Sequence, residues 1–260
     1  MNKVPKVVLE KISKTYKTKK QTVKVLSDVS VTVYEGEFVT IIGASGCGKS
    51  TLLRIIAGLD TDYEGVLKID NQVTRSISQN RGMVFQDHRL FPWMTVEENI
   101  AFGLSKHSLE ERKKIVRHYI EIIGLKGFEK AKPPELSGGM SQRVAIARVL
   151  SVQPDILLFD EPFGALDAMT RIRMQQEVLN IREKEKTTMI LVTHDIEEAV
   201  LLGDRVLVMS RNPGRIAKEI PVELSYPRDR NSIEFLRLKE KIFDIFFSDL
   251  KVEKVEDFTI

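Results

Sequence analysis

Hydrophobic residues in this chain fall into short runs that alternate with glycine-rich or polar segments. Residues 37–42 form a β-branched run, and residues 50–59 continue with helical spacing until Gly58. Two further apolar runs, 156–159 and 189–193, are too short for helices of ordinary length. Continuous apolar runs of this length are typical of strands buried on both faces, so the pattern predicts a mainly parallel sheet covered by helices.

Other parts of the chain follow different periods. Residues 7–33 alternate apolar and polar positions, which predicts antiparallel strands ahead of the parallel core. Thr95 with Glu98 and Ser108 with Glu111 have the spacing of capping boxes. They predict a helical insert, which we place at about 87–150.

The end of the chain departs from the core pattern. Residues 226–230 form a polar linker with a proline, and an amphipathic helix follows. We expect one large domain over 5–230, and a C-terminal helix and charged tail over 231–260. The helix carries an apolar stripe, which is expected to pack on its own domain, with a partner as the alternative: Phe235, Leu238, Ile242, Ile245 and Phe246.

Composition narrows the function classes. The 260 residues include 40 basic and 37 acidic side chains, a net charge of +3 spread without one-sign blocks, so charge gives a nucleic-acid partner no support. No apolar run reaches membrane-spanning length, and the amino terminus has no signal-peptide core. The single cysteine excludes an internal disulfide. These features favour a cytosolic globular protein.

A glycine-rich loop lies between the first core strand and its helix, and it fits the phosphate-binding loop pattern. Its glycines let backbone amides approach phosphates, and the following helix adds a favourable dipole. Lys49 is expected to reach the β and γ phosphates of ATP, and Ser50 to ligate Mg²⁺. The nucleotide-binding residues predicted here are Gly43, Ala44, Ser45, Gly46, Cys47, Gly48, Lys49, Ser50 and Thr51.

Two acids end the run 156–159. Asp160 is placed to hold Mg²⁺, and Glu161 to polarise an attacking water. Strand-end acids also serve as helix caps, but the phosphate loop upstream favours the catalytic interpretation.

A second predicted anion site is formed by Ser137, Gly138 and Gly139, which begin another helix. One ATP does not need two such sites. Taken together, the motifs resemble those of the ATP-binding cassette (ABC) ATPases, the motor subunits of ABC transporters, over about residues 7–230. The family's order of motifs is matched by Lys49, Gln86, Ser137, Asp160, Asp167 and His194.

The resemblance implies an α/β P-loop NTPase fold with a mainly parallel core sheet, an N-terminal antiparallel β subdomain and an α-helical insert. It also implies that two copies close head to tail around two ATP molecules, so that Ser137 and its glycines bind the partner's nucleotide.

The resemblance also implies individual roles. Tyr16 would stack on adenine, Gln86 would contact Mg²⁺ and the attacking water, and Asp167 would act across the dimer. His194 would hold the γ phosphate and support Glu161. Tyr16 could instead be a surface aromatic in a solvated basic loop, although stacking is the favoured interpretation, and an isolated histidine such as His194 is more often a surface or core residue.

Three segments, 86–95, 163–171 and 211–216, resemble bacterial importer ATPases for nitrate, sulfonates and taurine. Such a motor would work at the cytoplasmic face of the membrane with separate permease subunits and, indirectly, a solute-binding protein. A further hypothesis concerns Cys47: a thiol near a helix amino terminus can have a lowered pKa, so alkylation is expected to block ATP turnover.

Two alternatives stay open. A non-transport ABC ATPase acting on nucleic acid usually carries a long coiled coil between the phosphate loop and the second anion site, and this chain shows no sustained heptads there. A small-molecule kinase would use the phosphate loop but leaves Ser137 and Asp167 unexplained.

Overall fold

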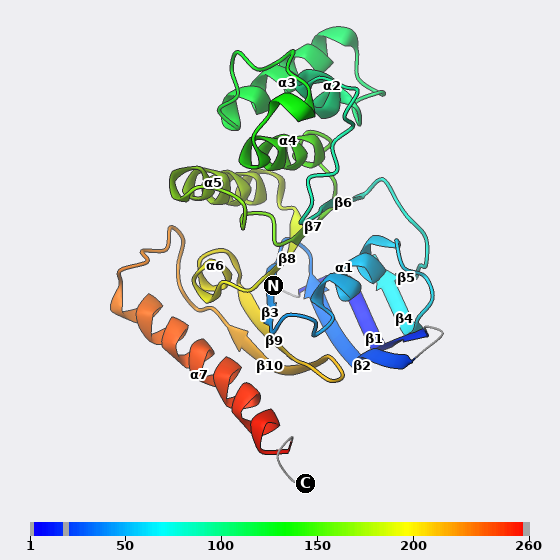
Figure 1. The fold of residues 1–260 in the computed structure, drawn as a ribbon, viewed down its shortest axis with the longest axis vertical. Helices are drawn as coiled ribbons and strands as arrows, with labels where there is room; N and C mark the ends of the chain where they lie inside the picture. The colour runs from blue at the N-terminus through cyan, green and yellow to red at the C-terminus, as the bar shows by residue number, and fades with distance from the viewer. Residues whose placement is uncertain (1–2, 18–20, 257–260) are drawn as a thin grey trace. The chain divides into compact units, whose positions relative to one another are not determined.

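A computed structural model describes residues 3–17 and 21–256 of the chain. Its contacts divide the chain into two compact units (Figure 1). Unit 1 comprises Met1–Ser78 and Thr188–Ile260, and unit 2 comprises Gln79–Thr187.

The core of unit 1 is a set of strands in the order β10-β9-β3-β8. Strand β3 (Phe38–Gly43) pairs in parallel with β8 (Thr188–Thr193) and with β9 (Arg205–Ser210), and β10 (Arg215–Pro221) pairs antiparallel with β9. Every residue of β3 and β8 is buried. The strand predicted at 37–42 is present one residue later, as β3, and the fully buried strand predicted at 189–193 is confirmed as part of β8.

A second sheet of unit 1 is antiparallel, with the order β2-β1-β4-β5. It consists of β1 (Pro5–Lys17), β2 (Thr22–Tyr34), β4 (Glu64–Ile69) and β5 (Gln72–Val73). Alternate residues of β2 such as Val29, Val31 and Val33 are buried. The alternating pattern of residues 7–33 predicted β1 and β2 correctly.

Among the described residues of unit 1, the helices are α1 (Lys49–Ala57), α6 (Ile196–Leu202) and α7 (Ile233–Glu256). Helix α1 ends where predicted, because Gly58 adopts the left-handed conformation with φ of 78°. Helix α7 packs on α6 and β9, burying Phe235 and Ile242 completely. The predicted stripe therefore packs on its own unit through these two residues, while Leu238, Ile245 and Phe246 remain partly exposed. The helix continues to Glu256, and residues 257–260 of the predicted tail lie outside the described residues.

Unit 2 joins a short parallel strand pair to several helices. Strands β6 (Arg81–Val84) and β7 (Ile156–Asp160) pair in parallel. The helices are α2 (Val96–Ala101), α3 (Leu109–Ile122), the single 3₁₀ turn η1 (Pro133–Glu135), α4 (Gly138–Leu150) and α5 (Ala168–Glu185). Helix α2 packs against both α3 and α4.

Both predicted capping boxes are present in unit 2. The Thr95 and Ser108 side chains accept hydrogen bonds from the Glu98 and Glu111 amides, and each glutamate accepts a bond in return from the cap residue's amide. These reciprocal bonds satisfy donors that a helix leaves unpaired at its start. Within the described part of the chain, no helix is long and apolar enough to cross a membrane.

Candidate nucleotide-binding site

The glycine-rich loop follows β3 and turns directly into α1. Gly46 and Gly48 have positive φ values of 80° and 99°, which side chains rarely tolerate. A Cβ on Gly48 would also lie 2.6 Å from the Leu26 Cδ2 atom of β2. The loop therefore needs glycine at this position for both backbone conformation and space.

Lys49 opens α1 with its side chain folded back onto the loop. Its ammonium donates hydrogen bonds to the Gly43 carbonyl at 2.8 Å and the Ala44 carbonyl at 3.2 Å. Only 6% of the residue is exposed. The loop thus places a cation beside the backbone amides of a helix amino terminus, an arrangement that suits polyphosphate.

The burial of the Cys47 thiol contradicts the hypothesis that this cysteine is reactive. Cys47 is 1% exposed. Burial raises the pKa of the thiol, and this outweighs the nearby Lys49 charge and the hydrogen bonds that act to lower it. A buried thiol with a raised pKa is a poor nucleophile, so the expected lowered pKa is wrong.

Two further predicted residues of unit 1 lie on either side of this loop in sequence. Tyr16 on β1 is 38% exposed, and its hydroxyl forms a side-chain hydrogen bond with Thr51, in the first turn of α1. The structure therefore brings Tyr16 to the phosphate loop's helix. His194 is exposed directly after β8, and Asp195 beside it caps α6.

The predicted acids of unit 2 sit at the carboxyl end of β7. Asp160 is the last residue of the strand and is 4% exposed. Glu161 follows with φ of 49°, an uncommon conformation for a residue other than glycine. Such backbone strain tends to persist where function requires it. Gln86 is exposed just beyond the end of β6.

The segment predicted as a second anion site is a helix start. Ser137 is the N-cap of α4, and its hydroxyl accepts a hydrogen bond from the Met140 amide at 3.3 Å. Ser137, Gly138 and Gly139 all lie at the surface, partly or fully exposed. Asp167 is likewise an N-cap, of α5, and its hydrogen bonds with Thr170 lower the pKa of its carboxyl group.

The sequence did not single out Lys14 or Asp60, yet they contact Tyr16. The Tyr16 hydroxyl donates to Asp60 Oδ2 at 2.9 Å, and Lys14 Nζ lies 2.8 Å from Asp60 Oδ1. The signal available in the sequence was weak: a lysine in a basic segment, and an acid just after the helix stop at Gly58.

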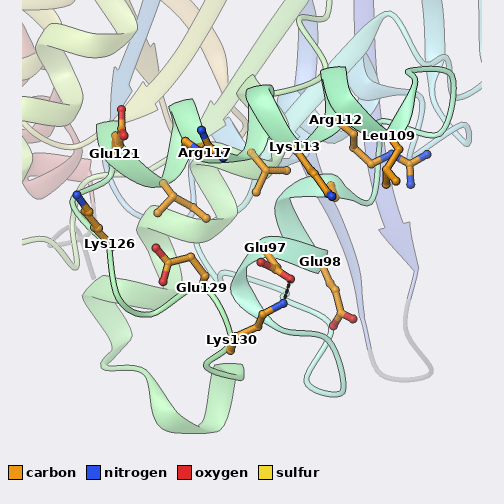
Figure 2. Close-up of a pocket in the computed structure, with 13 residues that line it drawn as sticks. Glu97, Glu98, Leu109, Arg112, Lys113, Arg117, Glu121, Lys126, Glu129 and Lys130 are labelled. Carbon is orange, nitrogen blue, oxygen red and sulfur yellow. Dashed lines mark hydrogen bonds and ion pairs between the residues drawn. The ribbon is translucent and has the colours of Figure 1, made fainter.

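Unit 2 also carries a surface groove, with a volume of about 760 Å³, between α2, α3 and the segment that follows α3 (Figure 2). Ala101, Val116 and Ile120 supply apolar lining, while charged residues of both signs surround it. Glu97 and Lys130 form an ion pair across one end, drawn as a dashed line in Figure 2.

Comparisons with known proteins agree with this geometry. The family model described as "ABC transporter" matches residues 26–164. The aliphatic sulfonates import ATP-binding protein SsuB of a Bacillus cereus strain is 52% identical over 92% of this chain and 95% of that protein. SsuB of Bacillus subtilis (strain 168) is 51% identical over 90% of this chain and 89% of its own length.

A solved structure supports the fold class. The ATP-binding cassette MJ0796, described as a dimer in a post-hydrolysis state bound to ADP and Pi, superposes with a TM-score of 0.77 at 36% identity. The match covers 84% of this chain and all of that one. The predicted P-loop fold, with its parallel core, antiparallel subdomain and helical insert, is confirmed. The chain belongs to the ABC transporter family and is one of its ATP-binding ATPase subunits.

Proposed function

We propose that this chain is the ATP-hydrolysing subunit of an importer for aliphatic sulfonates, working at the cytoplasmic face of the membrane beside a separate permease. The observation that carries the proposal is the 52% identity, over 92% of the chain, to a protein named for that import. A solute-binding protein would act on the permease from the other side. Nitrate and taurine importers, which the sequence also resembles, are the nearest competing assignments.

ATP binding is assigned first to the phosphate loop. Its amides and the amino terminus of α1 would hold the phosphates, and Lys49 would exchange its bonds to the Gly43 and Ala44 carbonyls for phosphate oxygens. These groups also stabilise the charge that develops on the γ phosphate during transfer.

The side-chain types of three predicted residues suit a magnesium ion. Ser50 offers a half-exposed hydroxyl at the start of α1, and Asp160 offers a carboxylate at the end of β7. Hydroxyl, carboxylate and amide oxygens are ligands that Mg²⁺ accepts, so Ser50, Asp160 and Gln86 would hold it. When bound, the ion would neutralise charge on the phosphate oxygens.

Hydrolysis is assigned to Glu161, which would orient or deprotonate the water that attacks the γ phosphorus in line. Gln86 would contact the same water, and His194 would donate a hydrogen bond to the γ phosphate while supporting Glu161. These roles use a carboxylate, an amide and an imidazole at strand ends, where ligands of open α/β sheets bind.

A second copy of the chain would complete each site. Ser137, Gly138 and Gly139 present a helix start at the surface, which suits the triphosphate bound by the partner. Asp167 would contact the partner's site, and Tyr16 would stack on adenine within its own chain. The similar cassette MJ0796 forms a dimer in its post-hydrolysis state, which supports this arrangement.

We assign residues 5–230 to the ATPase domain, with its helical insert at about 87–150, and residues 231–260 to the C-terminal helix and tail.

The permease is proposed to contact unit 2 at the groove between α2 and α3, which belongs to the helical insert. Its apolar floor and charged rim suit a short amphipathic helix from a cytoplasmic loop of the permease.

The groove assignment can be tested by cross-linking. Cys47 is the chain's only cysteine and is buried, so Leu109→Cys at the groove's edge, where Leu109 is 66% exposed, would supply one reactive thiol. We expect it to cross-link to permease cysteines in assembled transporter. Val73→Cys, at an equally exposed site in unit 1, is the control. Equal cross-linking of both, or none from Leu109→Cys, would contradict the assignment.

The solute that the importer transports can be identified by measuring uptake in cells. Cells lacking the chromosomal gene would receive wild-type protein or Glu161→Gln, and uptake of a labelled alkanesulfonate, taurine and nitrate would be compared. We expect the variant to lose alkanesulfonate uptake. Loss restricted to nitrate or taurine would overturn the sulfonate assignment while keeping the motor role, and unchanged uptake of all three would contradict both.

A further inference from the structure

The phenol ring of Tyr16 is held by two charged neighbours. Its hydroxyl donates a 2.9 Å hydrogen bond to Asp60 Oδ2, and the Lys14 ammonium lies 4.8 Å from the ring centroid. Lys14 also pairs with Asp60 Oδ1 at 2.8 Å. One carboxylate thus anchors both the ring's hydroxyl and the cation that lies against the ring.

This cluster is buried at its base and joined to the phosphate loop's helix. Lys14 is 4% exposed, and the side chain of Asp60 is 16% exposed, whereas Tyr16 keeps 38% of its surface open. The main-chain amide of Asp60 also bonds to the Arg54 carbonyl of α1. With the Tyr16–Thr51 bond, the ring is tied to α1 near both ends of the helix.

The protonation states of Tyr16 and Asp60 favour the hydrogen bond between them. Burial raises the pKa of the Tyr16 phenol, and the bond to Asp60 raises it further, so the hydroxyl remains a donor. Burial acts to raise the pKa of Asp60, but the hydrogen bonds from Lys14 and Tyr16 lower it overall, so the carboxylate remains an acceptor.

We propose that Asp60 and Lys14 are positioning residues for the adenine base: they fix the Tyr16 ring beside the phosphate loop before nucleotide arrives. The proposal rests on the base-stacking role given to Tyr16 under the proposed function. A ring already fixed loses less side-chain freedom on binding, which corresponds to about two- to tenfold in affinity. Asp60 therefore acts on the base and not on the phosphates.

An effect on the base can be separated from an effect on the phosphates by comparing ligands with and without a base. Binding of ATP and of inorganic tripolyphosphate, which has no base, would be measured by calorimetry on the full-length protein. Asp60→Ala removes the acceptor, and Tyr16→Phe removes only the hydroxyl while keeping the ring. We expect both to weaken ATP binding about two- to tenfold and to leave tripolyphosphate binding unchanged.

Asp62→Ala is the matched control. Its carboxylate is 97% exposed and lies 3.3 Å from Lys14, so it shares the cation with Asp60 but sits at the surface. We expect this variant to bind both ligands as the wild type does. Should Asp60→Ala fail to fold, Tyr16→Phe carries the test.

Tyr16→Ala separates the role of the ring from the role of its anchor. If it weakens ATP binding while Asp60→Ala and Tyr16→Phe do not, the ring matters and its anchor does not, which overturns the positioning role alone. If Tyr16→Ala also leaves ATP binding unchanged, the stacking role fails as well. Equal weakening of ATP and tripolyphosphate by Asp60→Ala would show an effect through α1 on the phosphate loop, and would overturn the inference.

Discussion

Gly214 lies against the main chain of Cys47 in the phosphate loop. A Cβ on Gly214 would come within 2.0 Å of the Cys47 carbonyl oxygen, a separation that no real contact reaches. The Gly214 amide donates to the Val25 carbonyl at 2.9 Å, and the Ser27 amide donates to the Gly214 carbonyl at 3.0 Å. The turn between β9 and β10 is therefore fixed to β2 and backs the loop that binds phosphate.

Gly214→Ala should displace the phosphate loop. The added methyl group meets backbone, which cannot swing away as a side chain can, so we expect a loss of about 1–3 kcal/mol in the free energy of unfolding. Binding of ATP and of tripolyphosphate should weaken together, as measured by calorimetry. Gly203→Ala is the control, because its Cβ would meet the Thr40 side chain at 2.6 Å, in the core of unit 1. Weakened binding in both variants would indicate general destabilisation.

Local patterns in the sequence predicted much of this fold. Strand, loop and helix follow in the expected order over residues 37–59, and both capping boxes and the stop at Gly58 were correct, because each depends on residues a few positions apart. The Tyr16–Asp60 bond joins positions 44 residues apart. The Gly214–Cys47 contact spans an even greater separation. Such pairings depend on how strands assemble, which periodicity does not specify.

The burial of Cys47 is another property that local sequence patterns did not predict, and the reactivity of its thiol can be measured. Position beside a helix amino terminus predicted a low thiol pKa, but burial dominates and raises it. We expect iodoacetamide to modify native protein near neutral pH much more slowly than free cysteine, and to label it readily in guanidinium chloride. Mass spectrometry would follow the reaction. Rapid labelling of native protein, with loss of ATP turnover, would restore the original hypothesis.

Glu161→Gln should stop turnover and preserve ATP binding. The amide keeps the shape of the side chain at its strained φ of 49°, but it cannot take a proton from water. We expect phosphate release to fall at least about a hundredfold and ATP to trap a dimer detectable by light scattering. Glu183→Gln, on the exposed surface of α5, is the control and should hydrolyse normally. Near-normal hydrolysis by the Glu161 variant would exclude the proposed role.

Ser137 allows its capping role to be separated from its proposed role at the partner's nucleotide. Ser137→Ala removes the bond from the Met140 amide and should cost about 1 kcal/mol of stability. Ser137→Asp keeps a good cap but places a negative charge where the partner's triphosphate would bind. We therefore expect the aspartate variant to unfold like the wild type yet to lose ATP-driven dimerisation. A normal dimer in that variant would contradict the shared-site arrangement.

The Lys14–Asp60 pair should give stability a defined dependence on pH. The pKa of Asp60 is lowered from 3.8, so its contribution is present above that value and is lost as pH falls through the lower, folded pKa. The pKa of Lys14 is raised from 10.5, so its contribution is present below that value and is lost as pH rises through the higher, folded pKa. Asp60 also raises the pKa of Tyr16 from 10.0, so that phenol titrates with the pair. The difference in unfolding free energy between wild type and Asp60→Ala, measured with denaturant, should be constant between 3.8 and 10.0 and shrink outside that range. A difference that changes steadily near neutral pH would mean that another group is linked to the pair.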